Sequence, residues 1–173
     1  MAGIKPLEKR PEHLNYIINE LLKPELRSVM FDDMIGMGEL AVWLYDPFTI
    51  IYGVFEKGHP VPIGCVILSG VRPFRGCEVH AAIFKPENRN AKKLQGIAHQ
   101  VKNDLILKWN LHYAEARCLA SNEAAKHLAQ KLGMTRVGVK PGNIIANGKY
   151  EDVEEFYVVL NGEKVFDLAK GGI

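Results

Sequence analysis

The spacing of apolar residues divides the chain into helical and strand-like stretches. Apolar positions recur every three or four residues after Pro11, after Pro24 and, for about five turns, after Ala91, which predicts three helices. Runs rich in β-branched and aromatic residues, separated by turn residues, then predict an antiparallel meander. Its three strands are expected at 48–55, 61–69 and 77–84. Residues 39–45 fit a helix or a strand equally well.

The segment from residue 113 onward predicts strands around one short helix. An apolar run at 113–120 indicates a buried strand, and Ser121 or Asn122 is a suitable N-cap for a helix that ends at Gly133. Two further strands are expected at 135–139 and 152–160, with turns at Pro141-Gly142 and Asn147-Gly148.

These elements, with a short first strand at 4–8, predict an α+β fold. Its mixed sheet is expected to be mostly antiparallel, with one central strand–helix–strand crossover that makes two strands parallel. We expect a single domain over residues 1–173, with a core at 4–162 and a C-terminal tail at 163–173.

Composition and charge narrow the function classes. With 47% apolar residues and a net charge of +2, the chain can bury one core and lacks the concentrated basic face of a nucleic-acid binder. Its apolar runs are far shorter than the roughly 18 residues that span a bilayer, and no signal-peptide segment follows Met1. We therefore expect a soluble cytoplasmic protein without a membrane or nucleic-acid partner. Cysteine and histidine spacings indicate neither disulfides nor a metal site.

Two segments carry a family resemblance. Residues 122–134 form a capped helix that ends in leucine, glycine and methionine, and residues 84–89 read as a strand end that leads into a loop. Together with the order of the predicted elements along the chain, these segments resemble the GNAT superfamily of acyl-CoA N-acyltransferases. The likeness covers most of residues 4–162. The resemblance implies the GNAT-like fold, acetyl-CoA as cosubstrate and an amine acceptor. It also implies that the strands at Ala82 and Cys118 splay apart to admit the pantetheine arm.

The resemblance places the coenzyme on the loop that follows the third meander strand. In the family this loop reads Gln or Arg, two residues, Gly, one residue, then Gly or Ala; Arg89 fits the first position, but Lys92 and Leu94 stand at the glycine positions. Cations at a helix start are unfavourable, and a bound anion relieves that repulsion. We hypothesise that side-chain charge holds the phosphates; a solvated basic helix face is the alternative. The implied coenzyme-binding residues are Ala82, Phe84, Arg89, Asn90, Ala91, Lys92, Lys93, Leu94 and Asn122.

Acyl transfer to an amine needs a base, because an ammonium group has no lone pair. Glu78 and His80 lie two residues apart on one strand and so share a face, which makes both candidates for this role. A solvated glutamate and a hydrogen-bonded sheet histidine are the alternative interpretation. For the general acid, many family members carry a tyrosine where this chain has Ala129. Tyr157 in the last strand is a candidate to replace it as general acid, and Tyr150 is a weaker candidate. The alternative is that both are aromatic residues of the core or the surface.

Two functions from different classes remain. One is an N-acetyltransferase that acts by direct attack of an amine on acetyl-CoA. The other is a catalytically inactive GNAT-like structural protein, similar to GNAT-like proteins of phages and prophages that are associated with virion assembly. The acidic residues at 151–155 could attract a cationic amine substrate, or they could form a solvated strand edge that discourages pairing with other strands. Apolar residues at 37–45 fit a homodimer contact or core packing.

Overall fold

A single seven-stranded sheet organises the molecule in a computed structural model, which describes residues 3–89 and 91–160, with only the backbone at 91–93. The strands lie in the order β1-β2-β3-β4-β5-β7-β6. The helices are α1 (Pro11–Leu21), α2 (Pro24–Met30), α3 (Met37–Tyr45), α4 (Ala91–Leu107) and α5 (Glu123–Lys131). The strands are β1 (Gly3–Pro6), β2 (Ile50–Phe55), β3 (Gly64–Ser69), β4 (Gly76–Ile83), β5 (Tyr113–Leu119), β6 (Thr135–Ala146) and β7 (Lys149–Val159).

The N-terminal half is close to the predicted arrangement. Pro11 and Pro24 stand at the first turns of α1 and α2, where a missing N–H costs no helical hydrogen bond. The segment that fitted helix or strand is the helix α3, whose Leu40 and Leu44 are buried. Strands β2, β3 and β4 form the predicted antiparallel meander.

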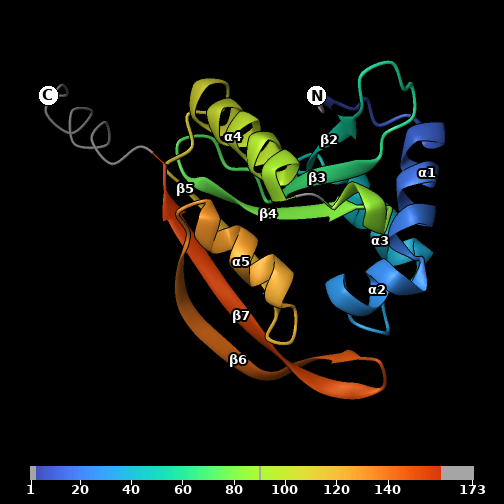
Figure 1. Ribbon diagram of the computed structural model, residues 1–173, viewed down its shortest axis with the longest axis vertical. Coiled ribbons are helices and arrows are strands. Elements are labelled where there is room, and N and C mark those ends of the chain that lie inside the picture. Colours follow the sequence, from blue (N-terminus) through green and yellow to red (C-terminus); the bar gives the residue numbers. More distant parts are fainter. Residues whose placement is uncertain (1–2, 90, 161–173) are drawn as a thin grey trace, which may run out of the picture.

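Two helical layers cover opposite faces of the sheet. Helices α1, α2 and α3 pack over one face of β2–β4, in a core that includes Leu14, Leu44 and Phe84. Helix α4 covers the other face through Ile97 and Val101, and α5 packs beside it over β5 and β7 (Figure 1). None of the helices in the described part of the chain is long and apolar enough to cross a membrane.

The central crossover joins β4 to β5 through α4, and these two strands are the parallel pair of the sheet. Their pairing is short: it begins at Gly76 opposite Tyr113 and ends at Glu78 opposite Glu115. Beyond that point β4 continues to Ile83 along β3, while β5 continues to Leu119 along β7. The sheet is therefore split between its two halves, as the predicted splay of the strands at Ala82 and Cys118 requires.

The prediction for the last strands is wrong in one place. Instead of turning at Pro141-Gly142, β6 runs through this dipeptide with a register shift between Lys140 and Ile144. A proline fits here because β6 is an edge strand and an irregular pairing needs no N–H from that residue. The turn at Asn147-Gly148 is present, with both residues at positive φ (54° and 70°).

Candidate active site

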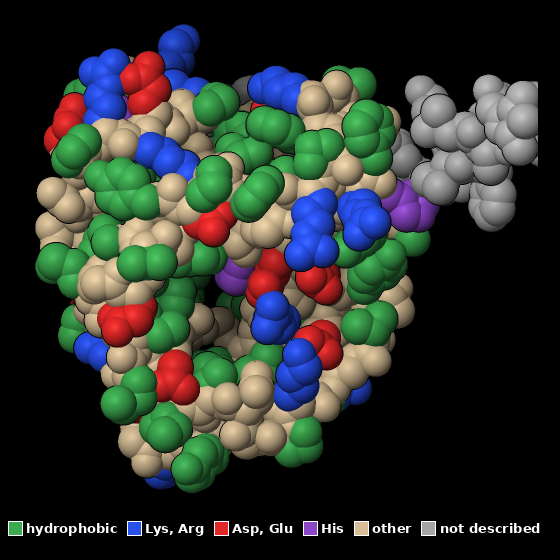
Figure 2. All heavy atoms as spheres, turned by 180° about the vertical axis from the view of Figure 1, so that it is seen from behind, with side chains coloured by type: hydrophobic (Ala, Val, Ile, Leu, Met, Phe, Trp, Pro, Cys, Tyr) green, Lys and Arg blue, Asp and Glu red, His purple; other side chains and the backbone are tan. Residues whose placement is uncertain are grey.

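A cavity of about 360 Å³ occupies the split between β4 and β5. Its wall comes from both sides of the sheet: α2 and the loop that follows it on one side, α4 and α5 on the other. Figure 2 shows the face opposite to that of Figure 1, with a hollow near its centre and charged side chains gathered beside it. A molecule that enters from the α4–α5 side can thus meet one that enters from the α2 side.

The edge of β4 that faces this cavity has backbone groups available for a ligand. The Phe84 N–H donates to the Ile63 carbonyl oxygen, so the even-numbered residues direct their backbone groups to β3. The odd-numbered residues Val79, Ala81 and Ile83 face the split instead, and all three line the cavity. The side chains of Ala82 and Phe84 are buried under α1–α3, and a contact of these two residues with a coenzyme stays a prediction.

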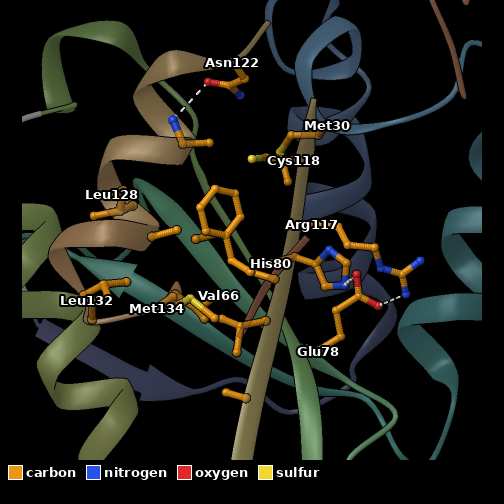
Figure 3. Close-up of a pocket in the computed structure, with 18 of the residues that line it drawn as sticks. Met30, Val66, Glu78, His80, Arg117, Cys118, Asn122, Leu128, Leu132 and Met134 are labelled. Atoms are coloured by element: carbon orange, nitrogen blue, oxygen red, sulfur yellow. Dashed lines mark hydrogen bonds and ion pairs between the residues drawn. The ribbon is translucent and has the colours of Figure 1, made fainter. Parts of the chain in front are cut away.

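Glu78 and His80 lie together in a polar cluster on the cavity wall (Figure 3). The His80 Nε2 atom is 3.1 Å from Ser69 Oγ and 3.5 Å from Glu78 Oε1. The other carboxylate oxygen of Glu78 accepts a hydrogen bond from Arg117 Nη2 at 2.5 Å. A side chain from β3, two from β4 and one from β5 are therefore linked at the point where the sheet splits.

The surroundings of His80 keep its ring uncharged at neutral pH. Burial lowers the pKa of His80, the Glu78 charge opposes this shift, and the Arg117 charge adds to it. The ring of Trp43 packs against it at 4.8 Å between centroids in an edge-on arrangement. Because two oxygens surround Nε2, we infer that Nε2 carries the hydrogen and that Nδ1 holds the lone pair. Nδ1 points away from Glu78 in Figure 3.

Ser69, His80 and Glu78 do not form a nucleophilic triad. In such a triad the serine and the acid contact different ring nitrogens, so that the ring can pass a proton from one to the other. Here both contact the same nitrogen, Nε2. The cluster can accept a proton at Nδ1, but it is not built to activate Ser69.

The start of α5 forms the opposite wall. Asn122 caps this helix, because its Oδ1 accepts a hydrogen bond from the Ala125 N–H at 3.1 Å. Cys118 lines the cavity nearby, opposite Met30 in Figure 3. Burial, the largest cause, raises the pKa of the Cys118 thiol to about 11. Cys118 is therefore a neutral thiol at physiological pH and a poor nucleophile.

A set of hydrogen bonds, here called the clasp, lies on the α2 side of the split. The loop after α2 meets the β6–β7 turn: the Asp33 N–H donates to the Ile145 carbonyl at 2.6 Å, and the Ile145 N–H donates to Asp32 Oδ2 at 3.0 Å. The Gly148 N–H donates to Asp33 Oδ2 at 2.7 Å. The clasp thus joins the two halves of the molecule at a point far from the β4–β5 pairing.

The predicted coenzyme loop is only partly described. Asn90 and the side chains of Ala91, Lys92 and Lys93 lie outside the described residues. Arg89 is exposed, and its Nε donates to the Ile83 carbonyl at 3.2 Å, at the end of β4. Leu94 is half-buried, lines the cavity and packs on the α4 core. The loop thus leads directly from the free edge of β4 to the start of α4.

Tyr157 lies on β7 opposite Glu115, and its ring stacks on Tyr113 at 5.2 Å between centroids. Neither this residue nor Tyr150 is among the described residues that line the cavity. The acidic run on β7 has partners: Glu154 pairs with Arg136 at 2.7 Å and Glu155 with Lys140 at 2.7 Å. Because these carboxylates already have cationic partners, the run is not a free site for a cationic amine. The alternative of a strand edge is wrong, because β7 lies between β5 and β6 in the sheet.

Four residues of the site were not singled out from the sequence: Ser69, Arg117, Asp32 and Trp43. The alternation of Glu115 and Arg117 places both on one face of β5. It would predict that Arg117 lies beside Glu78 only if the register of β5 against β4 were known. The cross-strand partner of Glu78 on β3 is Ser69, and this too is a matter of register. Trp43 and Asp32 come from separate segments and carry no local signal.

Of the comparisons with known proteins, only the one with solved structures finds similar chains. No protein-family model matches the chain, and no curated sequence does. Among solved structures, it is similar to the spermidine N-acetyltransferase from Vibrio cholerae in complex with CoA and spermine, with a TM-score of 0.78 and 20% identity over 92% of this chain and 96% of that chain. A dodecameric structure of that enzyme has a TM-score of 0.73 and 20% identity, over 95% and 97% of the two chains.

The chain has the GNAT fold. The similarity spans nearly the whole of both chains, and it includes the elements that make up the seven-stranded mixed sheet of this chain. The fold class predicted from residues 84–89 and 122–134 is therefore confirmed. At this level of identity the GNAT fold does not by itself identify the reaction, so the function rests on the cavity and its side chains.

Proposed function

We propose that this chain is an acyl-CoA-dependent N-acyltransferase that moves an acetyl group from acetyl-CoA to an amine. The observation that carries the proposal is the cavity between β4 and β5, with the neutral His80 on its wall. The Vibrio cholerae enzyme of the same fold was solved with CoA and spermine bound, which supports both a coenzyme and an amine.

The residues present fit a CoA thioester. The free backbone groups of Val79 and Ala81 can pair with the amide groups of the pantetheine arm, much as an added strand would. The pyrophosphate would lie at the start of α4, where helix N–H groups and the cations Arg89, Lys92 and Lys93 favour an anion. Asn122, at the start of α5, faces the same cavity.

His80 is the proposed base. Its Nδ1 takes a proton from the ammonium form of the acceptor, and the free amine then attacks the thioester carbonyl. The tetrahedral intermediate collapses with release of the CoA thiolate, which takes the second proton from the former amine nitrogen to give the amide and CoA thiol. In this proposal Glu78 and Ser69 hold the Nε2–H of His80 and so set the orientation of the ring.

Direct transfer is favoured over an acyl-enzyme. Two cysteines are among the described lining residues, Cys65 and Cys118, and both are protonated at neutral pH because burial raises their pKa to about 12 and about 11. A thiolate is a tolerable leaving group, so transfer does not require a strong acid. Tyr157 as general acid stays a prediction, and its stacking on Tyr113 gives the role no support.

An inactive structural role finds less support. Such a protein has no need of the split between β4 and β5, and a filled cleft would indicate that catalysis has been lost. Here the cavity is open between two walls and carries a histidine with a base-like environment. This observation favours the enzyme.

Acetyl transfer is tested by the release of CoA thiol from acetyl-CoA in the presence of primary amines. Wild-type protein should show amine-dependent release, and His80→Gln should reduce it by about two orders of magnitude or more, the usual contribution of a positioned base. The Arg136→Gln variant, which lies on β6 outside the described cavity wall, is the control. Amine-independent release alone, or equal rates in wild type and His80→Gln, would contradict the proposal.

A further inference from the structure

The side of the cavity that faces α2 carries a small and defined charge. The charged residues of its described lining are Asp32, Glu78 and Arg117. His80 is neutral because burial lowers its pKa. Two carboxylates and one guanidinium therefore leave a single negative charge on this side.

Both carboxylates already have partners within the chain. The two Asp32 oxygens accept hydrogen bonds from the N–H groups of Met34 at 2.8 Å and Ile145 at 3.0 Å. Glu78 is bound to Arg117 at 2.5 Å, and only 15% of its side chain is exposed. Each carboxylate is therefore already held by partners within the chain, Asp32 by two backbone N–H groups and Glu78 by a guanidinium.

The rest of this wall is apolar. Val29 and Met30 come from α2, Ile35 follows in the next loop, and Ile144 comes from β6. Met30 packs against the α1–α3 core on this side of the cavity and is labelled in Figure 3. A ligand that reaches His80 from this side passes aliphatic carbon and sulfur rather than charged groups.

We propose that the acceptor is a monoamine on an apolar or aromatic body, and that polyamines are poor acceptors. This inference rests on the proposed function. The single negative charge matches one ammonium group, whereas each further ammonium of a polyamine would lose water without gaining a partner. In this respect the chain differs from the enzyme of the same fold that is named for spermidine.

The choice of acceptor is tested by measuring kcat/KM with acetyl-CoA and either 2-phenylethylamine or spermidine. We expect the monoamine to be used at least about tenfold better, because an unpaired charge in an apolar site is strongly rejected. Equal values, or a higher value for spermidine, would overturn the inference. Absence of turnover with any amine counts against the proposed function instead.

A variant of the cavity wall provides a second test. Ile35 is half-buried and lines the cavity, so Ile35→Glu adds a carboxylate where a second ammonium would lie. Ile35→Gln is the matched control for size and polarity. The ratio of spermidine to 2-phenylethylamine use should rise about tenfold in Ile35→Glu relative to Ile35→Gln. An unchanged ratio would contradict the inference.

Binding separates this inference from catalysis. Saturation-transfer NMR on the wild-type chain, with CoA present, ranks the two amines in direct competition without any acyl transfer. Stronger binding of 2-phenylethylamine supports the inference even if no turnover is found. Stronger binding of spermidine, or no binding of 2-phenylethylamine, overturns it.

Discussion

At the scale of single residues, the proposed chemistry depends on the environment of His80. Its pKa is lowered mainly by burial, while Glu78 and Arg117 act on it with opposite sign. The folded-state pKa thus lies below the value of about 6.5 for a free histidine, so His80 becomes protonated only as the pH falls below that value. The free energy of unfolding should decrease as the pH falls through this range, because the unfolded chain binds the proton first.

Removal of the Glu78 charge and removal of the Arg117 charge should shift the pKa of His80 in opposite directions. Glu78→Gln removes a charge that favours the protonated ring, so the pKa of His80 should fall further. Arg117→Gln removes a charge that disfavours it, so the pKa should rise. Histidine NMR titration measures both shifts without any assay of activity. Shifts in the same direction in the two variants would show that the cluster does not act electrostatically on His80.

At the scale of elements, the short pairing of β4 with β5 determines where the sheet splits. Gly76 lies opposite Tyr113 at the start of this pairing, and a Cβ atom at Gly76 would come within 2.5 Å of the Tyr113 ring. A side chain there must displace either the ring or the strand. Because β4 and β5 pair at only three positions, moving either the Tyr113 ring or the strand would disturb much of this pairing.

Gly76→Ala should therefore lower the free energy of unfolding by about 1–3 kcal/mol, the usual cost of an overpacked site. Urea denaturation measures the change. Gly3→Ala is the control, because a Cβ atom at this strand glycine meets no atom within 4 Å. Similar losses in the two variants would mean that the contact with Tyr113 is not the cause.

The clasp gives a second prediction at this scale. Asp32→Ala removes the acceptor of the Ile145 N–H, so hydrogen exchange at Ile145 should accelerate. Asp46→Ala serves as control, since Asp46 also binds a backbone N–H, that of Phe48, but within its own turn. If exchange at Ile145 is equally slow in both variants, the clasp does not hold the β6–β7 turn.

At the scale of the whole molecule, most of the fold was predictable because its elements carry strong periodic patterns. The proline-capped helices and the meander followed from local sequence alone. The turn expected at Pro141-Gly142 was wrong because proline in an edge strand and proline in a turn leave the same local signal. Glu78 and His80 were found as neighbours on one strand, whereas Ser69 and Arg117 join them only through pairing between strands.

Binding of a CoA thioester in the cavity between β4 and β5 also depends on the whole molecule, because both halves of the sheet line that cavity. Ala81 lines this cavity from an exposed position on β4, so Ala81→Trp should fill the split without disturbing the core. Val137, which is 63% exposed on β6 and is not among the described lining residues, provides the control Val137→Trp.

Isothermal titration with acetyl-CoA tests binding in this cavity most directly. We predict that wild type and Val137→Trp bind acetyl-CoA with similar affinity, and that Ala81→Trp binds at least about tenfold more weakly, since the added ring occupies the ligand's place. No binding to the wild-type protein, or equal binding to all three proteins, would contradict the account.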